Sequence, residues 1–308
     1  MGGLGLIMDL SIIIVNWNTS ELLNQCLNSI YHNSSYYSME AIVVDNGSSD
    51  NSISMIENQF PLVILIKNDR NQGFARANNQ GLSIAKGRYF MLLNSDTIVL
   101  PGAFDKLIQT ADSHPELGVL GPQILNMDGS VQKSWASFPS FFSELIGRNL
   151  RIRKPVVSFP SAYEVDWITG ACMLVRARTI AEVGLLDDGY FMYSEETDWC
   201  LRIKNKGWKI WYLSNAEIYH LGGGSAKRTS LLQLSLLYQN KIRYFNKFYG
   251  PTQARLLRYG LALAYFLGLM RRLLLINFTD REEYMDRIRV QYKLIWCLLQ
   301  NKYPEVQG

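Results

Sequence analysis

The sequence predicts an α/β fold in which helices cover both faces of a mainly parallel central sheet, followed by a helical C-terminal appendage. Short β-branched and apolar runs alternate with segments of helical periodicity up to about residue 120. Several of these runs end in polar residues, as buried parallel strands do when they deliver side chains to a cleft. The chain has 308 residues, which is long for one core and favours a main domain with an addition.

Four strands and four helices are predicted in alternation over the first part of the chain. The first strand spans 10–15, and a helix with regularly spaced apolar residues follows over 20–31, capped by Thr19 or Ser20. The other strands are predicted over 40–44, 62–67 and 89–93, and the other helices over 52–58, 73–85 and 101–113. Strands and helices in this order predict a parallel sheet.

The second half of the chain is less regular. Residues 138–163 are rich in Pro, Ser and Arg, and we predict that they form a long, mobile loop over the site. A mostly helical piece is expected to begin near Thr229. The expected organisation is therefore a main domain over 1–228 and a basic, mostly helical region over 229–308.

Charge is distributed unevenly along the chain. From Lys227 to the end there are 14 basic and 5 acidic residues, against 17 and 22 before it. The basic part contains an apolar run over 261–270, and ten residues are too few to span a bilayer, which needs about 20. Two interpretations stay open: a core helix that closes the fold, or an amphipathic segment on an anionic membrane surface. No nucleic-acid motif accompanies the charge, so no nucleic-acid partner is expected.

Cysteine usage and the N-terminal residues indicate the compartment. The four cysteines lie far apart in the sequence, without metal-binding spacing, and are expected to be reduced and buried. Residues 1–10 lack the basic segment and apolar core of a signal peptide. We expect a cytoplasmic protein. Whether it also makes peripheral contact with the inner face of the cell membrane stays open.

Asp96 is the first candidate for a metal ligand. It follows the apolar run 90–93 and the pair Asn94 and Ser95, where a carboxylate is costly without a partner. A Mg²⁺ or Mn²⁺ ion that bridges diphosphate oxygens needs only one or two protein carboxylates. An Asx turn or helix cap is the structural alternative. His220, which a glycine run follows, is the candidate for a second ligand.

A second set of residues is expected to bind the donor nucleotide. Asp45 ends a predicted strand, where its carboxylate could accept an N–H of a pyrimidine base or a ribose hydroxyl, although Asp-Asn-Gly is also a turn signal. Arg76 offers a forked donor to phosphate or to Asp96. The full expected set is Val15, Asn16, Asn18, Asp45, Asn46, Gly73, Arg76, Asn78, Asn94 and Ser95.

The densest acidic cluster of the chain holds the candidates for a general base. Glu195, Glu196 and Asp198 follow an aromatic segment and begin a predicted helix. The helix dipole stabilises carboxylates in a first turn, so helix capping is a structural alternative. Carboxylates crowded beside an aromatic wall can nevertheless raise the pKa of one of them enough to make a usable base.

Eight segments occur in one order over residues 10–225: 14–18, 44–50, 71–78, 93–96, 167–171, 184–187, 191–202 and His220. Together they resemble the family 2 glycosyltransferases of the GT-A fold, and more narrowly their bacterial rhamnosyltransferase-type branch. The residues after Thr229 carry no motif of this kind.

The resemblance implies an enzyme that transfers a sugar from a nucleoside-diphosphate donor such as a dTDP- or UDP-sugar, with inversion at the anomeric carbon. Rhamnose is the favoured sugar. The acceptor would be a hydroxyl of a cell-surface glycan or of a polyprenyl-diphosphate-linked glycan. By resemblance, Asp96 holds a divalent cation with help from His220, Asp45 binds the nucleotide, and Glu196 is the base. Many members have Glu-Asp where this chain has two glutamates, so the choice among Glu195, Glu196 and Asp198 stays open.

Two other classes of protein fit the sequence less well than a glycosyltransferase. A sugar nucleotidyltransferase should carry a glycine-rich, basic loop after the first strand, and residues 16–19 provide neither feature. A non-catalytic sugar-nucleotide-binding or scaffolding protein of a glycan assembly complex would keep the nucleotide site and lose the base. The intact acidic cluster disfavours that alternative.

Overall fold

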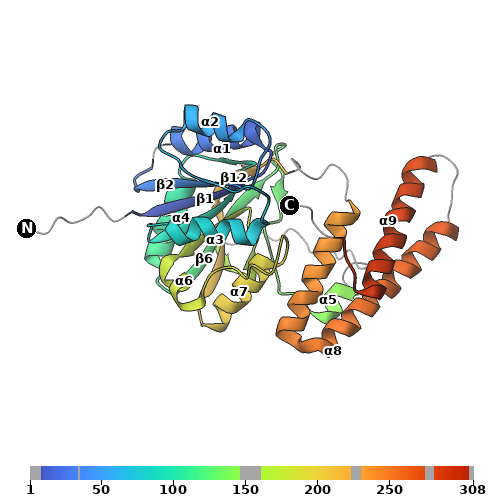
Figure 1. Cartoon of the computed structure of the whole chain (residues 1–308). Helices are drawn as coiled ribbons and strands as arrows, with labels where there is room; N and C mark the ends of the chain where they lie inside the picture. Colours follow the sequence, from blue (N-terminus) through green and yellow to red (C-terminus); the bar gives the residue numbers. More distant parts are fainter. Residues whose placement is uncertain (1–7, 34, 146–160, 223–229, 275–280, 305–308) are drawn as a thin grey trace, which may run out of the picture.

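A mixed, mostly parallel sheet forms the centre of the main domain (Figure 1). The structure is a computed structural model that describes residues 8–33, 35–145, 161–222, 230–274 and 281–304. Its sheet has the order β3-β2-β1-β4-β11-β6-β12-β5, with β7 beside β6 and β9 beside β12. The strands are β1 (Leu10–Asn16), β2 (Met39–Asp45), β3 (Ile64–Lys67), β4 (Tyr89–Asn94), β5 (Thr97–Val99), β6 (Leu117–Leu125), β7 (Val131–Gln132), β9 (Ala162–Glu164), β11 (Cys172–Arg176) and β12 (Lys209–His220), and β8 (Trp135–Ala136) pairs with β10 (Trp167–Ile168) apart from them.

Strands β1 to β4 run parallel, and their carboxyl ends therefore lie at one edge of the sheet. Strand β1 lies between β2 and β4, with Asn16 opposite Asp45 and Val15 opposite Asn94. Strand β11 runs antiparallel to both β4 and β6, whereas β12 is parallel to β6. The predicted mainly parallel sheet is confirmed, and β11, β5, β7 and β9 are the strands that make it mixed.

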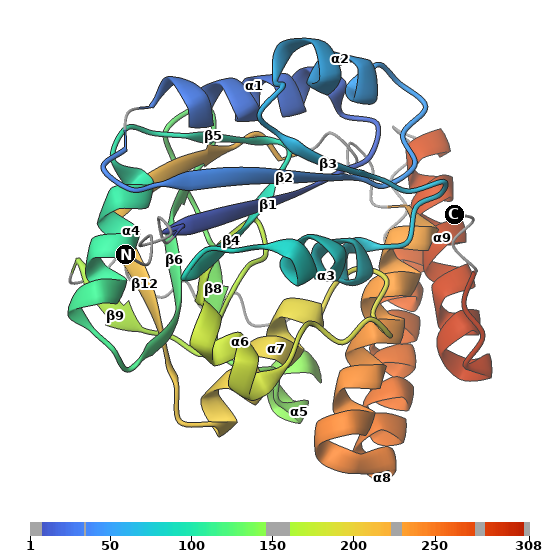
Figure 2. The same ribbon diagram turned by 60° about the vertical axis from the view of Figure 1, so that its left-hand side comes forward.

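Helices cover both faces of the sheet, as predicted (Figure 2). Helices α1, α2 and α4 pack on one face, and α3, α6 and α7 pack on the other. Their bounds are α1 (Ser20–His32), α2 (Ser52–Gln59), α3 (Phe74–Ile84), α4 (Ala103–Ser113), α6 (Ala177–Val183) and α7 (Glu195–Asn205).

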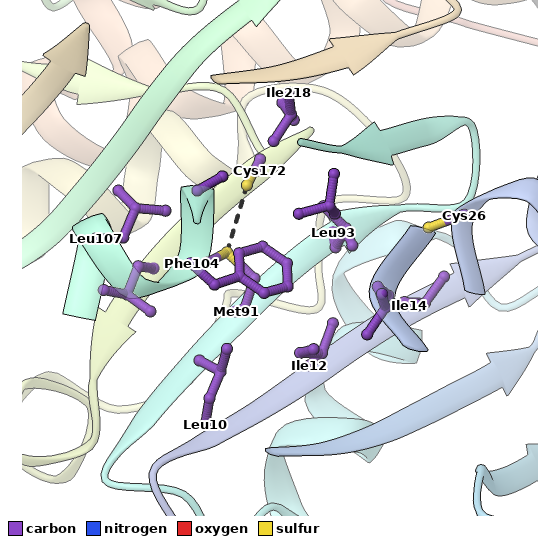
Figure 3. Packing of buried hydrophobic residues seen from close by; sticks show 14 of the residues in the cluster. Leu10, Ile12, Ile14, Cys26, Met91, Leu93, Phe104, Leu107, Cys172 and Ile218 are labelled. Carbon is purple, nitrogen blue, oxygen red and sulfur yellow. Dashed lines mark hydrogen bonds between the residues drawn. The ribbon is translucent and has the colours of Figure 1, made fainter. Parts of the chain in front are cut away.

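The alternation of side chains along β1 creates the two cores. Leu10, Ile12 and Ile14 point to the face of α1 and α4, where Phe104 packs over them (Figure 3). Ile13 points to the opposite face, against α3. There Gly81 allows a close approach, because a Cβ atom at this position would lie 2.5 Å from Ile13 Cγ2. Successive residues of a strand face opposite ways, so one fully apolar strand supplies both layers.

Helices α8 (Leu231–Leu274) and α9 (Arg281–Gln300) make up the C-terminal region, and α8 lies on the side of the main domain that carries α7 (Figure 1). Helix α8 is broken at Gly250, whose φ of 86° lies outside the helical range, directly before Pro251. Buried side chains from both halves of α8 and from α9 form a third apolar cluster, on which the short helix α5 (Phe141–Leu145) also packs. Within the described residues, no helix is both long and apolar enough to cross a membrane.

Two sequence expectations change in the structure. Residues 141–145, predicted as irregular, form α5, because Phe141 and Leu145 find an apolar partner surface on α8 that the local sequence does not reveal. Residues 146–160 of the predicted loop lie outside the described residues. The apolar run over 261–270 supports the core interpretation for one face only: Leu261 and Leu269 are buried, whereas Leu267 is exposed.

Candidate active site

The ends of β1 and β2 are joined by buried polar contacts. Asn16 donates through Nδ2 to Asp45 Oδ2 at 2.9 Å and to Ser48 Oγ at 3.1 Å. The backbone N–H of Ser48 donates to Asp45 Oδ1 at 2.9 Å. Asn16 and Asp45 are both fully buried. Each oxygen of Asp45 therefore already accepts one hydrogen bond, and the carboxylate first of all orders the loop that follows β2.

The loop after β1 is held against the loop after β2. Asn18 has a left-handed backbone, with φ of 54°, and its Oδ1 accepts from the backbone N–H of Ser49 at 2.7 Å. The carboxylate of Asp50 accepts from the backbone N–H of Ser20 at 2.9 Å and so caps α1. The predicted cap residue Thr19 occupies the N-cap position without a capping bond from its side chain. Val15 lies partly buried beneath this loop.

Asn46 fastens the segment before α3 to the same edge of the sheet. Its Nδ2 donates to Asn71 Oδ1 at 2.8 Å, and its Oδ1 accepts from the backbone N–H of Gln72 at 2.9 Å. The structure therefore brings together Asn16, Asp45 and Asn46 as the sequence suggested.

Three further expected donor-site residues lie on or beside α3. Gly73 has φ of 86°, and a Cβ atom there would lie 2.5 Å from the carbonyl oxygen of Phe191, so the glycine allows α3 to meet the segment before α7. Asn78 is buried and donates back to the carbonyl of Phe74, within its own helix. Arg76 is half exposed and pairs with Asp188 at 3.4 Å. The expected contact of Arg76 with Asp96 is not found among the described residues, since the guanidinium extends toward Asp188 instead.

A polar group at the end of β4 meets the end of β12. His220 Nε2 lies 3.2 Å from Asp96 Oδ1 and 3.3 Å from Asn94 Nδ2. His220 Nδ1 lies 2.8 Å from Gln132 Oε1. An amide oxygen can only accept, so Nδ1 donates to Gln132, and this orients Nε2 toward the carboxylate of Asp96. Four residues from three strands and one loop thus converge on one point.

Two acceptor atoms 3.2 Å apart repel each other unless a proton or a cation is shared between them. Imidazole nitrogen and carboxylate oxygen are both ligands that Mn²⁺ accepts, and carboxylate oxygen suits Mg²⁺. Among the described residues, no cluster of three or more His, Cys, Asp or Glu side chains could enclose a metal ion. The geometry therefore fits a cation held by Asp96 and His220 whose remaining ligands come from a substrate.

Ser95 connects the two polar groups. It is buried, and its Oγ lies 2.9 Å from Thr19 Oγ1, which in turn donates to Asn16 Oδ1 at 2.7 Å. The residue next to the metal-binding candidate Asp96 is therefore hydrogen-bonded to the loop after β1 and, through Thr19, to the end of β1.

The acidic cluster begins α7 after a strained turn. Tyr193 and Ser194 both have left-handed backbones, with φ of 73° and 74°. This conformation costs an L-residue other than glycine roughly 1–2 kcal/mol. Such strain persists where the surrounding structure holds it in place, and it is frequent at functional sites.

Glu195 and Glu196 lie side by side in this first turn. Burial raises the pKa of both carboxyl groups, and the neighbouring charge of Glu196 raises the pKa of Glu195 further. The backbone N–H groups of the turn donate to Glu196 and hold its pKa below that of Glu195. Oε2 of each has no hydrogen-bond partner among the described residues. Of the two carboxyl groups, Glu196 is therefore the first to ionise.

Asp198 has a different environment from the two glutamates. Its carboxylate is fully buried, accepts from Arg202 Nε at 2.7 Å, and contacts Lys247 Nζ at 2.6 Å. The hydroxyl of Tyr190 donates to it at 3.2 Å. A fully buried carboxylate that two cations and a hydroxyl already engage is not directed at a substrate, so the geometry favours a structural role for Asp198.

Helix α8 supports the segment that leads into α7. Lys247 Nζ bridges Asp198 Oδ2 and Asp187 Oδ2, both at 2.6 Å. Asn240 Nδ2 donates to the carbonyl of Met192 at 2.7 Å, and Arg243 pairs with Asp187 at 3.2 Å. The first half of α8 is thus bonded directly to the residues that position the glutamate pair.

Lys247→Met is expected to lower the free energy of unfolding by about 2–3 kcal/mol, because it leaves a buried carboxylate with Arg202 as its one remaining cation. The value lies below the range for fully buried pairs because Lys247 is 34% exposed. Urea unfolding measures the change. The control is Lys67→Met, which breaks an exposed pair with Glu57 and should cost less than about 1 kcal/mol. Equal losses in the two variants would contradict the bridging role.

Glu195→Gln is expected to be more stable than the parent chain at neutral pH. In the unfolded chain the carboxyl group of Glu195 has a pKa of about 4.3. In the folded chain its pKa is raised, so it keeps its proton at pH values where the unfolded chain has lost it. Parent stability therefore falls as pH rises from that value toward the raised folded pKa. Glutamine cannot ionise, so the variant lacks this decline and should match the parent near pH 4. Urea unfolding at pH 4 and 7.5 tests this, and parallel curves would refute it.

Sequence reasoning missed Gln132, Thr19 and Lys247. Gln132 orients His220 from a two-residue strand, and Lys247 lies 49 residues after Asp198. Neither carries a local signal, because an isolated Gln or Lys is common on any surface. Thr19 was considered only as a helix cap, although its hydroxyl joins two strand ends.

The mixed sheet, with polar residues at the carboxyl ends of its parallel strands, is that of the GT-A glycosyltransferase fold. The chain belongs to glycosyl transferase family 2, whose family model matches residues 11–184. Within that family it resembles the rhamnosyltransferases.

Two curated relatives and two solved structures illustrate the similarity. N-acetylglucosaminyl-diphospho-decaprenol L-rhamnosyltransferase of Mycobacterium tuberculosis is 29% identical over 203 residues, which cover 59% of this chain and 66% of that protein. Poly-beta-1,6-N-acetyl-D-glucosamine synthase of Staphylococcus aureus is 28% identical over 210 residues, 66% of this chain and 47% of that protein. The chain thus spans between about half and two thirds of the lengths of these relatives.

The fold is shared with structures of low sequence identity. GalNAc-T7 with UDP, GalNAc and Mn²⁺ matches with a TM-score of 0.62 at 15% identity, over 97% of this chain and 58% of that one. The mannosyltransferase PcManGT from Pyrobaculum calidifontis, in complex with GDP-Man and Mn²⁺, matches with a TM-score of 0.58 at 14% identity, over 95% and 86%. These matches confirm the predicted GT-A fold.

Proposed function

We propose that this chain is an inverting glycosyltransferase that moves a sugar from a nucleoside-diphosphate donor to an acceptor hydroxyl, with Glu196 as the base. The observation that carries the proposal is the glutamate pair. Glu196 is the one of the three clustered acids that is neither fully buried nor neutralised by a cation. Its raised pKa strengthens it as a proton acceptor.

The proposed reaction needs no covalent intermediate. Glu196 takes the proton of the acceptor hydroxyl as that oxygen attacks the anomeric carbon from the face opposite the leaving group. Glu195, which keeps its own proton, donates toward Glu196 and prevents two adjacent negative charges. Inversion follows from this single displacement.

Asp96 and His220 are proposed to hold a divalent cation, Mg²⁺ or Mn²⁺, with the donor diphosphate completing the ligand set. A cation bound there would neutralise the charge that develops on the departing nucleoside diphosphate. The facing lone pairs of the two side chains support this assignment, and the similar structures were determined with Mn²⁺. Asp45, Asn16 and the loops that they order are proposed to receive the base and ribose.

The donor is proposed to be a dTDP- or UDP-sugar, with rhamnose favoured, and the acceptor a polyprenyl-diphosphate-linked glycan. The similarity to the mycobacterial rhamnosyltransferase supports both choices. Such an acceptor would bring the basic helical region, 229–308, to the cytoplasmic face of the membrane as a peripheral contact, beside the catalytic domain, 1–228. The contacts of α5 with α8 show that this proposed boundary is bridged by packing.

Calorimetric titration with dTDP, UDP and GDP, each with Mn²⁺ and with chelator, tests the donor site. We expect dTDP or UDP to bind when Mn²⁺ is present and to bind far more weakly with chelator. A folded sample that binds none of the three nucleotides would refute the catalytic proposal. The scaffolding alternative would retain nucleotide binding and show no transfer.

Gln132→Leu is expected to weaken Mn²⁺-dependent nucleotide binding by about 10- to 100-fold, the range for residues that orient a metal-binding histidine. The substitution removes the acceptor that fixes the His220 tautomer. Gln132→Glu keeps an acceptor at the same position and should bind nearly as well as the parent. Calorimetry measures both, and a leucine variant that binds normally would show that His220 does not act at the metal.

A further inference from the structure

A cavity of about 410 Å³ lies between the two halves of α8 and the residues that follow α9. It opens beside the break at Gly250, where Pro251 turns the helix back on itself. Its polar lining includes Arg243, Arg255, Arg258, Asn246, Asn301 and Tyr303. None of the described lining residues is acidic, so the cavity has a strongly positive character.

Two buried polar atoms in this lining have no hydrogen-bond partner among the described residues: Arg258 Nε and the hydroxyl of Tyr303. Both are donors at neutral pH, since burial raises the pKa of Tyr303 to about 12. Buried donors are almost always satisfied in native proteins, so two of them in one cationic cavity indicate an absent acceptor. Each guanidinium also keeps donors beyond its one hydrogen bond among the described residues; that of Arg255, for example, runs from Nε to the carbonyl of Pro251.

An exposed apolar stripe runs along the second half of α8, directly beside this cavity. It consists of Tyr259, Leu263, Phe266, Leu267, Met270 and Leu273, which are between 38 and 59% exposed. Their spacing of three or four residues places them on one face of the helix. Arg255 precedes Tyr259 by one helical turn, so the guanidinium of Arg255 lies where the cavity and the stripe meet. An amphipathic face with cations at its edge is typical of a helix that lies in a membrane interface.

We propose that the cavity binds the diphosphate group of the lipid-linked acceptor while the α8 stripe contacts the lipid. This proposal rests on the proposed function, because it assumes a polyprenyl-diphosphate acceptor. The arginine fork matches phosphate oxygens, and basic pockets at a membrane surface bind anionic head groups. A free anion would use the cavity and would have no need of the apolar stripe.

The cavity is connected to the catalytic segment through one side chain. Arg243 lines the cavity and pairs with Asp187, and Asp187 shares Lys247 with the buried Asp198 of α7. A diphosphate in the cavity would therefore lie on the same framework that positions the glutamate pair. The acceptor sugar would extend from that anchor toward Glu196.

The test measures binding of farnesyl diphosphate in phosphatidylcholine vesicles and of inorganic pyrophosphate in solution, both with chelator so that the donor site does not contribute. Arg255→Gln and Arg258→Gln should each weaken binding of the lipid diphosphate by about tenfold or more. Arg271→Gln, an exposed substitution on the same helix away from the cavity, is the matched control. Arg255 is exposed, so its variant remains informative even where Arg258→Gln impairs folding.

Each outcome decides the proposal. Loss of lipid diphosphate binding in the cavity variants, with normal binding in the control, supports it. Pyrophosphate binding without lipid binding shows a free-anion site and overturns the acceptor assignment, as does an equal loss in Arg271→Gln. Nucleotide binding with Mn²⁺ in the same samples reports the donor site separately, so failure here is distinguishable from failure of the proposed function. Replacing Leu263 and Leu267 by Gln should weaken vesicle binding and leave pyrophosphate binding unchanged.

Discussion

Glu196→Gln should lower kcat by about 10²- to 10⁴-fold, the contribution of a positioned general base. Glutamine has nearly the same shape and keeps the hydrogen bonds that the first turn of α7 donates to its side-chain oxygen. It cannot take a proton from the acceptor hydroxyl. Because Glu196 belongs to the acceptor side of the proposed reaction, binding of the donor nucleotide should change little. Single-turnover transfer and nucleotide titration, run on one preparation, separate the two effects.

The adjacent residue provides the matched control for this experiment. Burial and the neighbouring Glu196 raise the pKa of Glu195, and glutamine reproduces both the shape of its protonated form and its ability to donate. Glu195→Gln should therefore keep kcat within about tenfold of the parent. If Glu195→Gln lowered kcat more than Glu196→Gln, Glu195 would be the base. Normal turnover in Glu196→Gln would remove Glu196 from the mechanism.

The pH dependence of the parent enzyme follows from the same pair. Transfer requires ionised Glu196, and burial raises its pKa above the usual glutamate value. The rate should therefore fall as pH decreases through that raised pKa, at a higher pH than an exposed glutamate would give. In Glu196→Gln the remaining slow reaction should lack this acid limb.

Asp96→Asn is the second large expected effect. It should reduce Mn²⁺-dependent nucleotide binding by more than about 100-fold, the upper range for residues that only orient a ligand. Asparagine keeps the size of the side chain and one oxygen, but it removes the negative charge that faces His220 Nε2. Without that charge the site has the imidazole of His220 and no carboxylate among its described ligands. Nucleotide titration at several Mn²⁺ concentrations measures the loss.

Asp128→Asn serves as the control, because Asp128 is exposed and organises a turn through Ser130. It should bind nucleotide as the parent does. Strong nucleotide binding by Asp96→Asn that no longer responds to chelator would mean that the donor site works without a cation. That result would contradict the metal assignment while leaving the fold and the family unaffected.

The first half of the sheet could be predicted from the sequence because β1, β2 and β4 are largely buried on both faces. Strand β1 is apolar at almost every position, and its helix follows with regular spacing. Strand β6 escaped prediction because Gly118, Gly121 and Pro122 interrupt it and are ordinarily turn signals. Both glycines are required by close neighbours: a Cβ atom at Gly121 would lie 2.4 Å from the side chain of Ile168. Such contacts depend on residues far away in the chain.

The sequence predicts which residues belong to the candidate site, but it does not predict the role of each residue. Strand ends indicated Asp45 and Asp96, since parallel strands bring their carboxyl ends to one edge. The acidic cluster left three possible bases, because successive helical residues point about 100° apart and the sequence does not show which direction faces the cleft. Tertiary structure distinguishes them: Lys247 and Arg202 neutralise Asp198, and Glu195 is buried, whereas Glu196 is partly exposed.

The two left-handed residues before α7 have a consequence for how this enzyme can change. Tyr193 and Ser194 have strained backbones in the segment that positions the glutamate pair. Glycine at either position would relieve the strain. Selection for heat resistance alone would therefore favour glycine there, whereas selection for turnover would preserve the strained residues. Thermal tolerance and catalytic speed are in this way opposed at two adjacent positions, and the ancestry of the enzyme should record which of the two its habitat demanded.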